Sequence, residues 1–220
     1  PYRWGATVMA YRKSKFRDLG WTPTDWSDLW RPALKDKLSL PNQPREVIGL
    51  TLKKLNRSYN TANLNAVSDL RSELQALDRQ VKFYSSTDYL QPLLLEDTWV
   101  AVGWSTDVLP LLEGEPDIAV VVPRSGTALW SDIWVWPQLG PSSTQVCRQW
   151  VEFWWQPEVA QALSRFTDAV SPVLLDHSLS SPSATLLHSR QPWFANSEFL
   201  DPLPTEALKQ YQAAWQQLRA

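Results

Sequence analysis

Ala128-Leu-Trp-Ser-Asp-Ile-Trp-Val-Trp-Pro137 is the stretch around which the rest of the chain is organised. Its residues 130–136 predict a β-strand, whose successive side chains point to opposite faces. Trp130 and Asp132 then share one face, and Pro137 ends the strand because proline cannot donate to the hydrogen-bond ladder. The stretch could simply be a buried core strand. A carboxylate in an apolar strand is costly, however, unless a cation meets it, either an Arg or Lys of the chain or an amine of a ligand.

Size and composition exclude several classes of protein. The 220 residues suffice for one large domain or two small lobes. A net charge of -2 and a pI of about 5.7 give no basic surface for nucleic acid. The single cysteine, Cys147, excludes an internal disulfide, and no apolar run is long enough to span a membrane. The chain opens at Pro1 almost directly on a strand pattern, from which we expect further sequence upstream.

Strand and helix patterns alternate over most of the length. Strands are predicted at residues 4–11, 38–40, 81–84, 99–104, 117–122 and 130–136. Helices are predicted at residues 24–30, 45–55, 88–95 and 205–219, from Asn63 through Leu77, after Ser105, from Ser142 through Trp155, and from Pro157 onward. Residues 167–204 read as an irregular connection. This order predicts an α/β fold with largely parallel pairing.

The familiar signatures of catalysis and metal binding are missing. The sequence has no phosphate loop, no Gly-x-Ser-x-Gly turn and no pair of histidines at metal-ligand spacing. His177 and His188 read as surface residues, and Cys147 reads as a small core residue. We therefore predict no catalytic residue, no metal and no cofactor.

The remaining signal is a set of acids and indoles near the ends of predicted strands, where open α/β sheets bind ligands. The members are Glu46, Trp104, Trp130 and Asp132. Carboxylates pair with ammonium groups, and indoles cover methylene chains and attract cations. This combination suits a small cationic solute with an aliphatic spine, although any single tryptophan could instead be core.

The order of motifs along the chain carries a family resemblance. The motifs are Trp4-Gly-Ala-Thr, Ser27-Asp-Leu-Trp30, Arg45-Glu-Val, Leu52-Lys-Lys-Leu55, Trp104-Ser, Leu129-Trp-Ser-Asp132 and Pro157-Glu-Val-Ala160. In this order they resemble the periplasmic spermidine/putrescine-binding proteins of ABC importers, with the type 2 periplasmic binding protein fold. That family has two α/β lobes, joined by crossing strands, that close on the ligand.

The resemblance also implies a domain division. Residues 11–127 correspond to a complete second lobe, and residues 1–10 and 128–184 to the crossing strands and the returning part of an incomplete first lobe. Residues 185–220 correspond to an irregular tail and a C-terminal helix that docks on the second lobe. Because strands at 1–10 and 129–137 would lack neighbours, we expect the 220 residues alone to be poorly soluble or to bind weakly.

The same resemblance implies roles for single residues. Glu46 matches a carboxylate that receives an amine, Trp104 and Trp130 match aromatic walls, and Asp132 matches a central acid. Gln43 is a further candidate ligand-binding residue, at a position where polyamine binders often carry a second acid. Departures from the family pattern also occur at Ala169, in place of a tyrosine, and at Leu200, near a position that often holds a polar residue.

The leading hypothesis is a periplasmic solute-binding subunit of an ABC importer, with a polyamine resembling putrescine or spermidine as its ligand. It predicts permease subunits as membrane partners, no nucleic-acid partner, a monomer and no enzymatic activity. One alternative is a carbohydrate-active enzyme with tryptophan platforms and two carboxylates. Another is a cytosolic ligand-sensing domain of the same fold. The leading hypothesis fails if Glu46 and Asp132 face apart, or if an Arg or Lys of the chain neutralises each of them.

Overall fold

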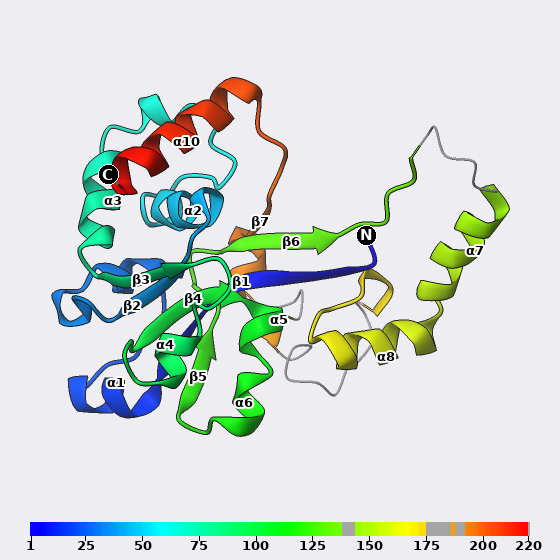
Figure 1. Ribbon diagram of the computed structural model, residues 1–220, viewed down its shortest axis with the longest axis horizontal. Helices are drawn as coiled ribbons and strands as arrows, with labels where there is room; N and C mark the ends of the chain where they lie inside the picture. The colour runs from blue at the N-terminus through cyan, green and yellow to red at the C-terminus, as the bar shows by residue number, and fades with distance from the viewer. Residues whose placement is uncertain (138–143, 175–185, 188–191, 220) are drawn as a thin grey trace.

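The computed structural model describes residues 1–137, 144–174, 186–187 and 192–219. It is an elongated α/β molecule, which confirms the predicted fold class (Figure 1). Two strands, β1 (Arg3–Arg12) and β6 (Ala128–Asp132), run from a large lobe toward a smaller part at the other end. We call this smaller part, residues 133–137 and 144–174, the arm.

The described strands form one sheet in the order β3-β2-β4-β1-β6-β7, and β5 also pairs with β1. The remaining strands are β2 (Leu38–Pro41), β3 (Val81–Ser85), β4 (Val100–Trp104), β5 (Ile118–Val121) and β7 (Glu198–Phe199). Strand β2 is parallel to β3 and β4, and β6 is parallel to β7. Strand β1, however, is antiparallel to β4, β5 and β6. The prediction of largely parallel pairing is therefore wrong for β1, because alternation of strands and helices does not specify how each connection crosses the sheet.

Helices cover the sheet of the large lobe and build the arm. The α-helices are α1 (Lys13–Leu19), α2 (Pro44–Lys54), α3 (Leu70–Asp78), α4 (Gln91–Leu94), α5 (Ser105–Val108), α6 (Leu111–Gly114), α7 (Thr144–Trp154), α8 (Pro157–Thr167) and α10 (Thr205–Arg219). Short 3-10 helices are η1 (Trp26–Trp30), η2 (Pro32–Leu34), η3 (Leu64–Ala66), η4 (Pro172–Leu174) and η5 (Pro192–Asn196). The predicted helix after Asn63 is thus split, and Ser68 and Asp69, which favour helix ends over interiors, lie at the break.

Strand β6 is shorter than the predicted strand. It ends at Asp132, and residues 133–137 have no regular structure and are exposed, so the prediction that Pro137 ends the strand is wrong. The reason lies in the partner strand. The ladder with β1 finishes at Arg3 opposite Asp132, followed by one bond from the Tyr2 N–H to the Asp132 carbonyl. Beyond that point no described strand lies beside residues 133–137, so the alternating pattern has nothing to pair with.

Two hydrophobic clusters pack against opposite faces of β1. Met9 belongs to a cluster that includes the buried residues of α2 and α3 and the fully buried Trp26. Ala6 and Val8 belong to a second cluster that includes Leu93 of α4. Successive β1 side chains therefore enter different cores, which explains why the strand lacks an exposed face and reads as almost continuously apolar.

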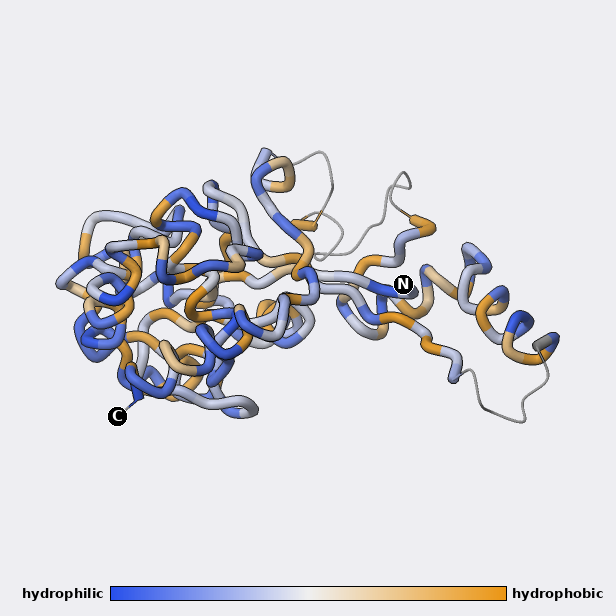
Figure 2. Tube along the Cα trace, turned by 90° about the horizontal axis from the view of Figure 1, so that it is seen from above, coloured by the Kyte–Doolittle hydropathy of each residue, from blue (hydrophilic) through white to orange (hydrophobic). Residues whose placement is uncertain are grey.

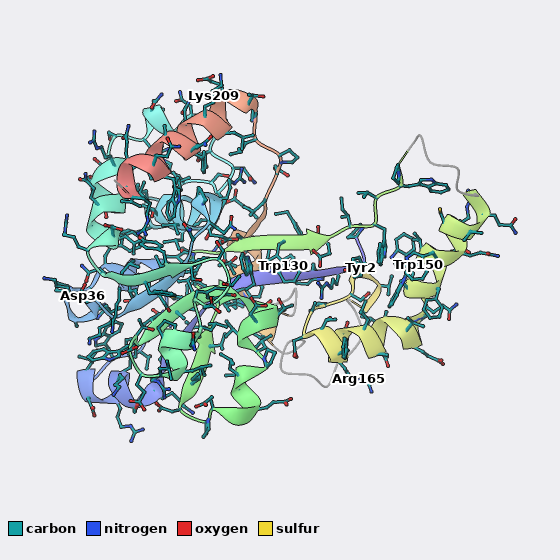
Figure 3. All side chains as sticks on the ribbon, in the orientation of Figure 1. Tyr2, Asp36, Trp130, Trp150, Arg165 and Lys209 are labelled. Atoms are coloured by element: carbon teal, nitrogen blue, oxygen red, sulfur yellow. The ribbon has the colours of Figure 1, made fainter. Side chains whose placement is uncertain are left out.

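The arm carries aromatic side chains that are only partly covered. Tyr2 stacks on Trp134 with ring centroids 4.6 Å apart, and Trp134 lies edge-on to Trp150 at 5.8 Å. Trp150 of α7 is half exposed, and Figure 3 shows it beside Tyr2 at the end of the molecule away from the large lobe. Figure 2 shows further hydrophobic residues along this helix. Cys147 lies here too, and it is half-buried rather than the core residue predicted.

The end of the chain returns to the large lobe. Strand β7 pairs with β6, and α10 packs against α2, α3 and η3. Tyr211 of α10 is buried, and its hydroxyl donates to the carbonyls of Tyr59 and Thr61. The division into lobes at residues 11–127 and 128–184 stays a prediction.

Candidate ligand-binding site

Glu46 is a buried carboxylate at the junction of sheet and helix. It lies in the first turn of α2, directly after β2, where the helix dipole favours an acid. Its two oxygens accept hydrogen bonds from the Thr7 hydroxyl at 2.9 Å and from the Trp104 indole N–H at 3.3 Å. Burial raises the pKa of this carboxyl, and the two hydrogen bonds and the positive charge of Arg45 oppose that rise. Glu46 thereby joins β1, α2 and β4 at one point.

Trp104 is the last residue of β4 and is half-buried. Its ring meets that of Tyr89 edge-on at 5.6 Å, while its N–H is directed at Glu46. The Tyr89 hydroxyl donates to Asp107, and the close approach of Tyr89 requires a glycine before Trp104, since a Cβ on Gly103 would lie 2.2 Å from the Tyr89 ring. The indole is thus held from both sides.

Trp130 lies over the backbone of β1. Its register partner is Gly5, and a Cβ placed on Gly5 would lie 2.2 Å from a Trp130 ring carbon. The same Cβ would approach the Ser105 hydroxyl, which accepts a bond from the Ala6 N–H at 3.2 Å. Only glycine at position 5 leaves room for the indole to lie flat on the strand. Figure 3 shows Trp130 at the crossing between the large lobe and the arm.

Asp132 is paired with an arginine of the chain. The Arg3 Nε donates to the Asp132 carboxylate at 2.6 Å, and the two residues face each other across the β1–β6 ladder. Both side chains are partly exposed, 28% for Arg3 and 39% for Asp132. The sequence left open whether Asp132 is met by an Arg or Lys of the chain or by a ligand amine. In the structure its partner is an arginine of the chain, Arg3.

Gln43 is next to this network through its backbone, since its carbonyl accepts the Glu46 N–H at 3.1 Å. Gln43 precedes α2, is exposed and makes no side-chain capping bond. His177 and His188 lie outside the described residues. Within the described ranges, no group of three His, Cys, Asp or Glu side chains could hold a metal ion.

The candidate residues follow one face of the crossing strands. Thr7, Gly5 and Arg3 alternate along β1 and stand beside Glu46, Trp130 and Asp132 in turn. At about 3.3 Å per residue, Thr7 and Arg3 are roughly 13 Å apart. The row therefore runs from a buried carboxylate, past an indole face, to an ion pair.

Comparison with known proteins identifies the family. A family model described as bacterial extracellular solute-binding protein matches residues 1–191. The chain belongs to this family. The resemblance to the spermidine/putrescine-binding proteins, inferred from the order of motifs, is thereby confirmed. A spermidine/putrescine-binding periplasmic protein of Salmonella typhimurium is 26% identical over 182 residues, which cover 83% of this chain and 51% of that protein. A putrescine/cadaverine-binding protein of Pseudomonas aeruginosa is 30% identical over 112 residues, 49% of this chain and 32% of that protein.

Solved structures of solute-binding proteins share the fold. The crystal structure of a spermidine/putrescine ABC transporter substrate-binding protein from Streptococcus pneumoniae superposes with a TM-score of 0.83 at 20% identity, covering all of this chain and 68% of that one. The type 2 periplasmic binding protein-like fold is thus confirmed. The chain spans about half the length of the first curated relative. None of the helices in the described ranges is both long and apolar enough to cross a lipid bilayer.

Sequence reasoning missed the residues of β1 that support the candidate site. Thr7 binds Glu46, Gly5 admits Trp130 and Arg3 neutralises Asp132. The sequence does contain a signal for these three residues. Positions 3, 5 and 7 alternate with the buried apolar positions 4, 6 and 8, so they lie together on the other face of the strand. The partners, however, lie up to 129 residues away in the sequence.

Proposed function

We propose that this chain forms part of a solute-binding subunit of an ABC importer, and that it binds a small cationic solute of the polyamine class through Glu46, Trp104 and Trp130, with Gln43 beside Glu46 and the Arg3-paired Asp132 at the other end of the site. Family membership supports the solute-binding role. The names of the curated relatives support an amine-bearing ligand.

The observation that carries the ligand class is the state of Glu46. Its carboxylate is buried, and its described partners are the neutral donors Thr7 and Trp104. Among the described residues, no lysine, arginine or histidine lies within 4 Å of it. Arg45, whose guanidinium donates to Asn60, acts on Glu46 only from farther away, whereas the other candidate acid, Asp132, has Arg3 in contact. A buried carboxylate without a cation is costly, and a ligand ammonium group placed against it offsets that cost. The condition under which the hypothesis fails, a chain cation on both acids, is met at Asp132 and not at Glu46.

The proposed mechanism is binding and delivery without catalysis. The ammonium group sits at Glu46, and the indoles of Trp104 and Trp130 cover the aliphatic part of the ligand. Closure about the crossing strands β1 and β6 then removes the ligand from water and presents the closed surface to the permease. The carbohydrate-hydrolase alternative is not favoured, because that chemistry needs two available carboxylates and Asp132 is engaged by Arg3.

Titration calorimetry with putrescine and spermidine tests the ligand class. We expect binding by the wild-type protein, and a loss of at least about tenfold in affinity for Trp104→Ala, which removes one aromatic wall. Trp155→Ala serves as the control, because Trp155 is an exposed tryptophan of the arm outside this row. No heat with any amine at millimolar concentration contradicts the proposed ligand.

Cell fractionation tests the proposed periplasmic location. It also distinguishes the importer hypothesis from the alternative of a cytosolic sensor with the same fold. We expect the protein in the periplasmic fraction, where an importer subunit meets its permease. Recovery with the cytosolic fraction instead supports the sensor.

A further inference from the structure

We infer that Arg3 is a specificity residue of the candidate site: by occupying Asp132 it selects a short diamine and disfavours a longer triamine. This inference rests on the proposed function, since it concerns which cation the same row of residues accepts. It assigns a role to an arginine whose described hydrogen bond and ion pair are with Asp132.

The first step is the position of the ion pair. Arg3 and Asp132 are cross-strand neighbours, and Arg3 lies on the same face of β1 as Gly5 and Thr7. Trp130, over Gly5, therefore stands between the ion pair and Glu46. A ligand that lies along the row meets Glu46 at one end and the Arg3–Asp132 pair at the other.

The second step is the charge along the row. Within the row, Glu46 and Asp132 each carry a negative charge and Arg3 a positive one, which leaves one net negative charge at Glu46. Arg45 lies outside the row, donates to Asn60 and acts on Glu46 only from beyond 4 Å. One ammonium group is therefore matched by the described residues. A second ammonium group that reached Asp132 would have to displace Arg3, and it would then lie close to the displaced guanidinium, where like charges repel.

The third step is length. Thr7 and Arg3 are separated by roughly 13 Å along the strand. The four-carbon spine of putrescine is too short to span that distance, so a putrescine anchored at Glu46 does not bring its second charge to Arg3. Spermidine is longer and carries an additional amine, so one of its charges approaches the guanidinium. The presence of Arg3 therefore penalises the triamine more than the diamine.

The test compares the affinities of putrescine and spermidine for the wild-type protein and for Arg3→Gln by titration calorimetry. We expect the wild type to prefer putrescine. Arg3→Gln frees Asp132 and should raise spermidine affinity about tenfold while changing putrescine affinity by less than about threefold, the scale of one charge–charge interaction at a partly exposed site.

Further variants separate charge from folding. Arg3→Lys keeps a cation beside Asp132 and should keep the wild-type preference. The double variant Arg3→Gln/Asp132→Asn removes the freed carboxylate and should abolish the gain for spermidine, so the coupling appears in a double-mutant cycle. Arg31→Gln is the matched control, because Arg31 forms a comparable pair with Asp28 at 2.8 Å outside the row.

Two results would overturn this inference and leave the proposed function intact. One is a spermidine-to-putrescine affinity ratio that Arg3→Gln leaves unchanged, and the other is a wild-type protein that prefers spermidine while Arg3 is intact. If neither the wild type nor any variant binds an amine, the proposed function fails and the inference falls with it.

Discussion

The large lobe and the arm use the same residue type in opposite ways. In the large lobe Trp26 is completely buried, and its indole N–H donates to the Gly126 carbonyl at 2.9 Å. In the arm Trp134 and Trp150 pack mainly on other aromatic rings and remain 43% and 50% exposed. An apolar sequence pattern therefore reports that a surface is suited to burial, and the local surroundings decide whether it is buried. The large lobe has its own complete core, whereas the aromatic face of the arm is open among the described residues.

The largest expected effect tests this difference directly. Trp26→Ala should lower the free energy of unfolding by about 3–5 kcal/mol, because it leaves a cavity in a closed core and an unpaired Gly126 carbonyl. Trp150→Ala should cost only about 1 kcal/mol, the scale of an exposed aromatic contact. Urea denaturation measures both. Equal losses would show that the aromatic cluster of the arm is as well packed as the lobe.

The next prediction concerns the crossing strands, where the two regions meet. Gly5→Ala should destabilise the protein by about 1–3 kcal/mol, because the new methyl group collides with the Trp130 ring and the Ser105 hydroxyl. Gly114→Ala in α6 is the matched control, since a Cβ there meets no atom within 4 Å. If thermal unfolding shows the two variants to be alike, Trp130 can move aside at no cost and the crossing is looser than described.

A third prediction uses the raised pKa of Glu46. A carboxyl whose pKa is higher in the folded than in the unfolded protein holds its proton longer when folded, so stability falls as pH rises from its ordinary pKa through the raised one. Glu46→Gln cannot ionise and should lack this loss. Its stability relative to the wild type should therefore improve as pH rises from about 4 to 7, measured by urea denaturation at several pH values. Asp97→Asn, in an exposed pair with Lys82, is the control. A difference between Glu46→Gln and wild type that is independent of pH contradicts the prediction.

The smallest expected effects compare two lysines. Lys53 is largely buried and binds both Glu198 and the Asn196 carbonyl, which ties the end of η5 and the start of β7 to α2. Lys209 forms an exposed pair with Glu206 on α10. Lys53→Met should cost about 1–2 kcal/mol and Lys209→Met less than about 0.5 kcal/mol. Amide exchange near Glu198 should quicken only in the first variant.

The sequence predicted most elements of the large lobe, because periodicity reports burial and nearly every apolar face there is buried. It placed helix 45–55 and the strand at 99–104 within a residue of α2 and β4. It was wrong at residues 133–137, where the alternation continues although β1 offers no further partner. Pairing direction was also wrong for β1, because the direction depends on residues far along the chain.

The candidate site was predicted only in part for the same reason. Glu46 and Trp104 were both singled out, and the structure joins them by a hydrogen bond that the sequence did not predict. The state of Asp132 could not be predicted, since the choice between an internal arginine and a ligand amine depends on the β1–β6 register. Gln43 was placed by resemblance alone, and its binding role, like those of Trp130 and Asp132, stays a prediction.

The pairing of β1 with three later strands has a kinetic consequence. Its ladder with β6 joins residues separated by 129 positions, and the ladders with β4 and β5 are also non-local. Closing such long loops costs conformational entropy before the strand contacts form and stabilise the chain, so high contact order slows folding. We expect β1 to remain unpaired until late in folding, which makes the lobe a slow folder whose rate is limited by docking its first strand.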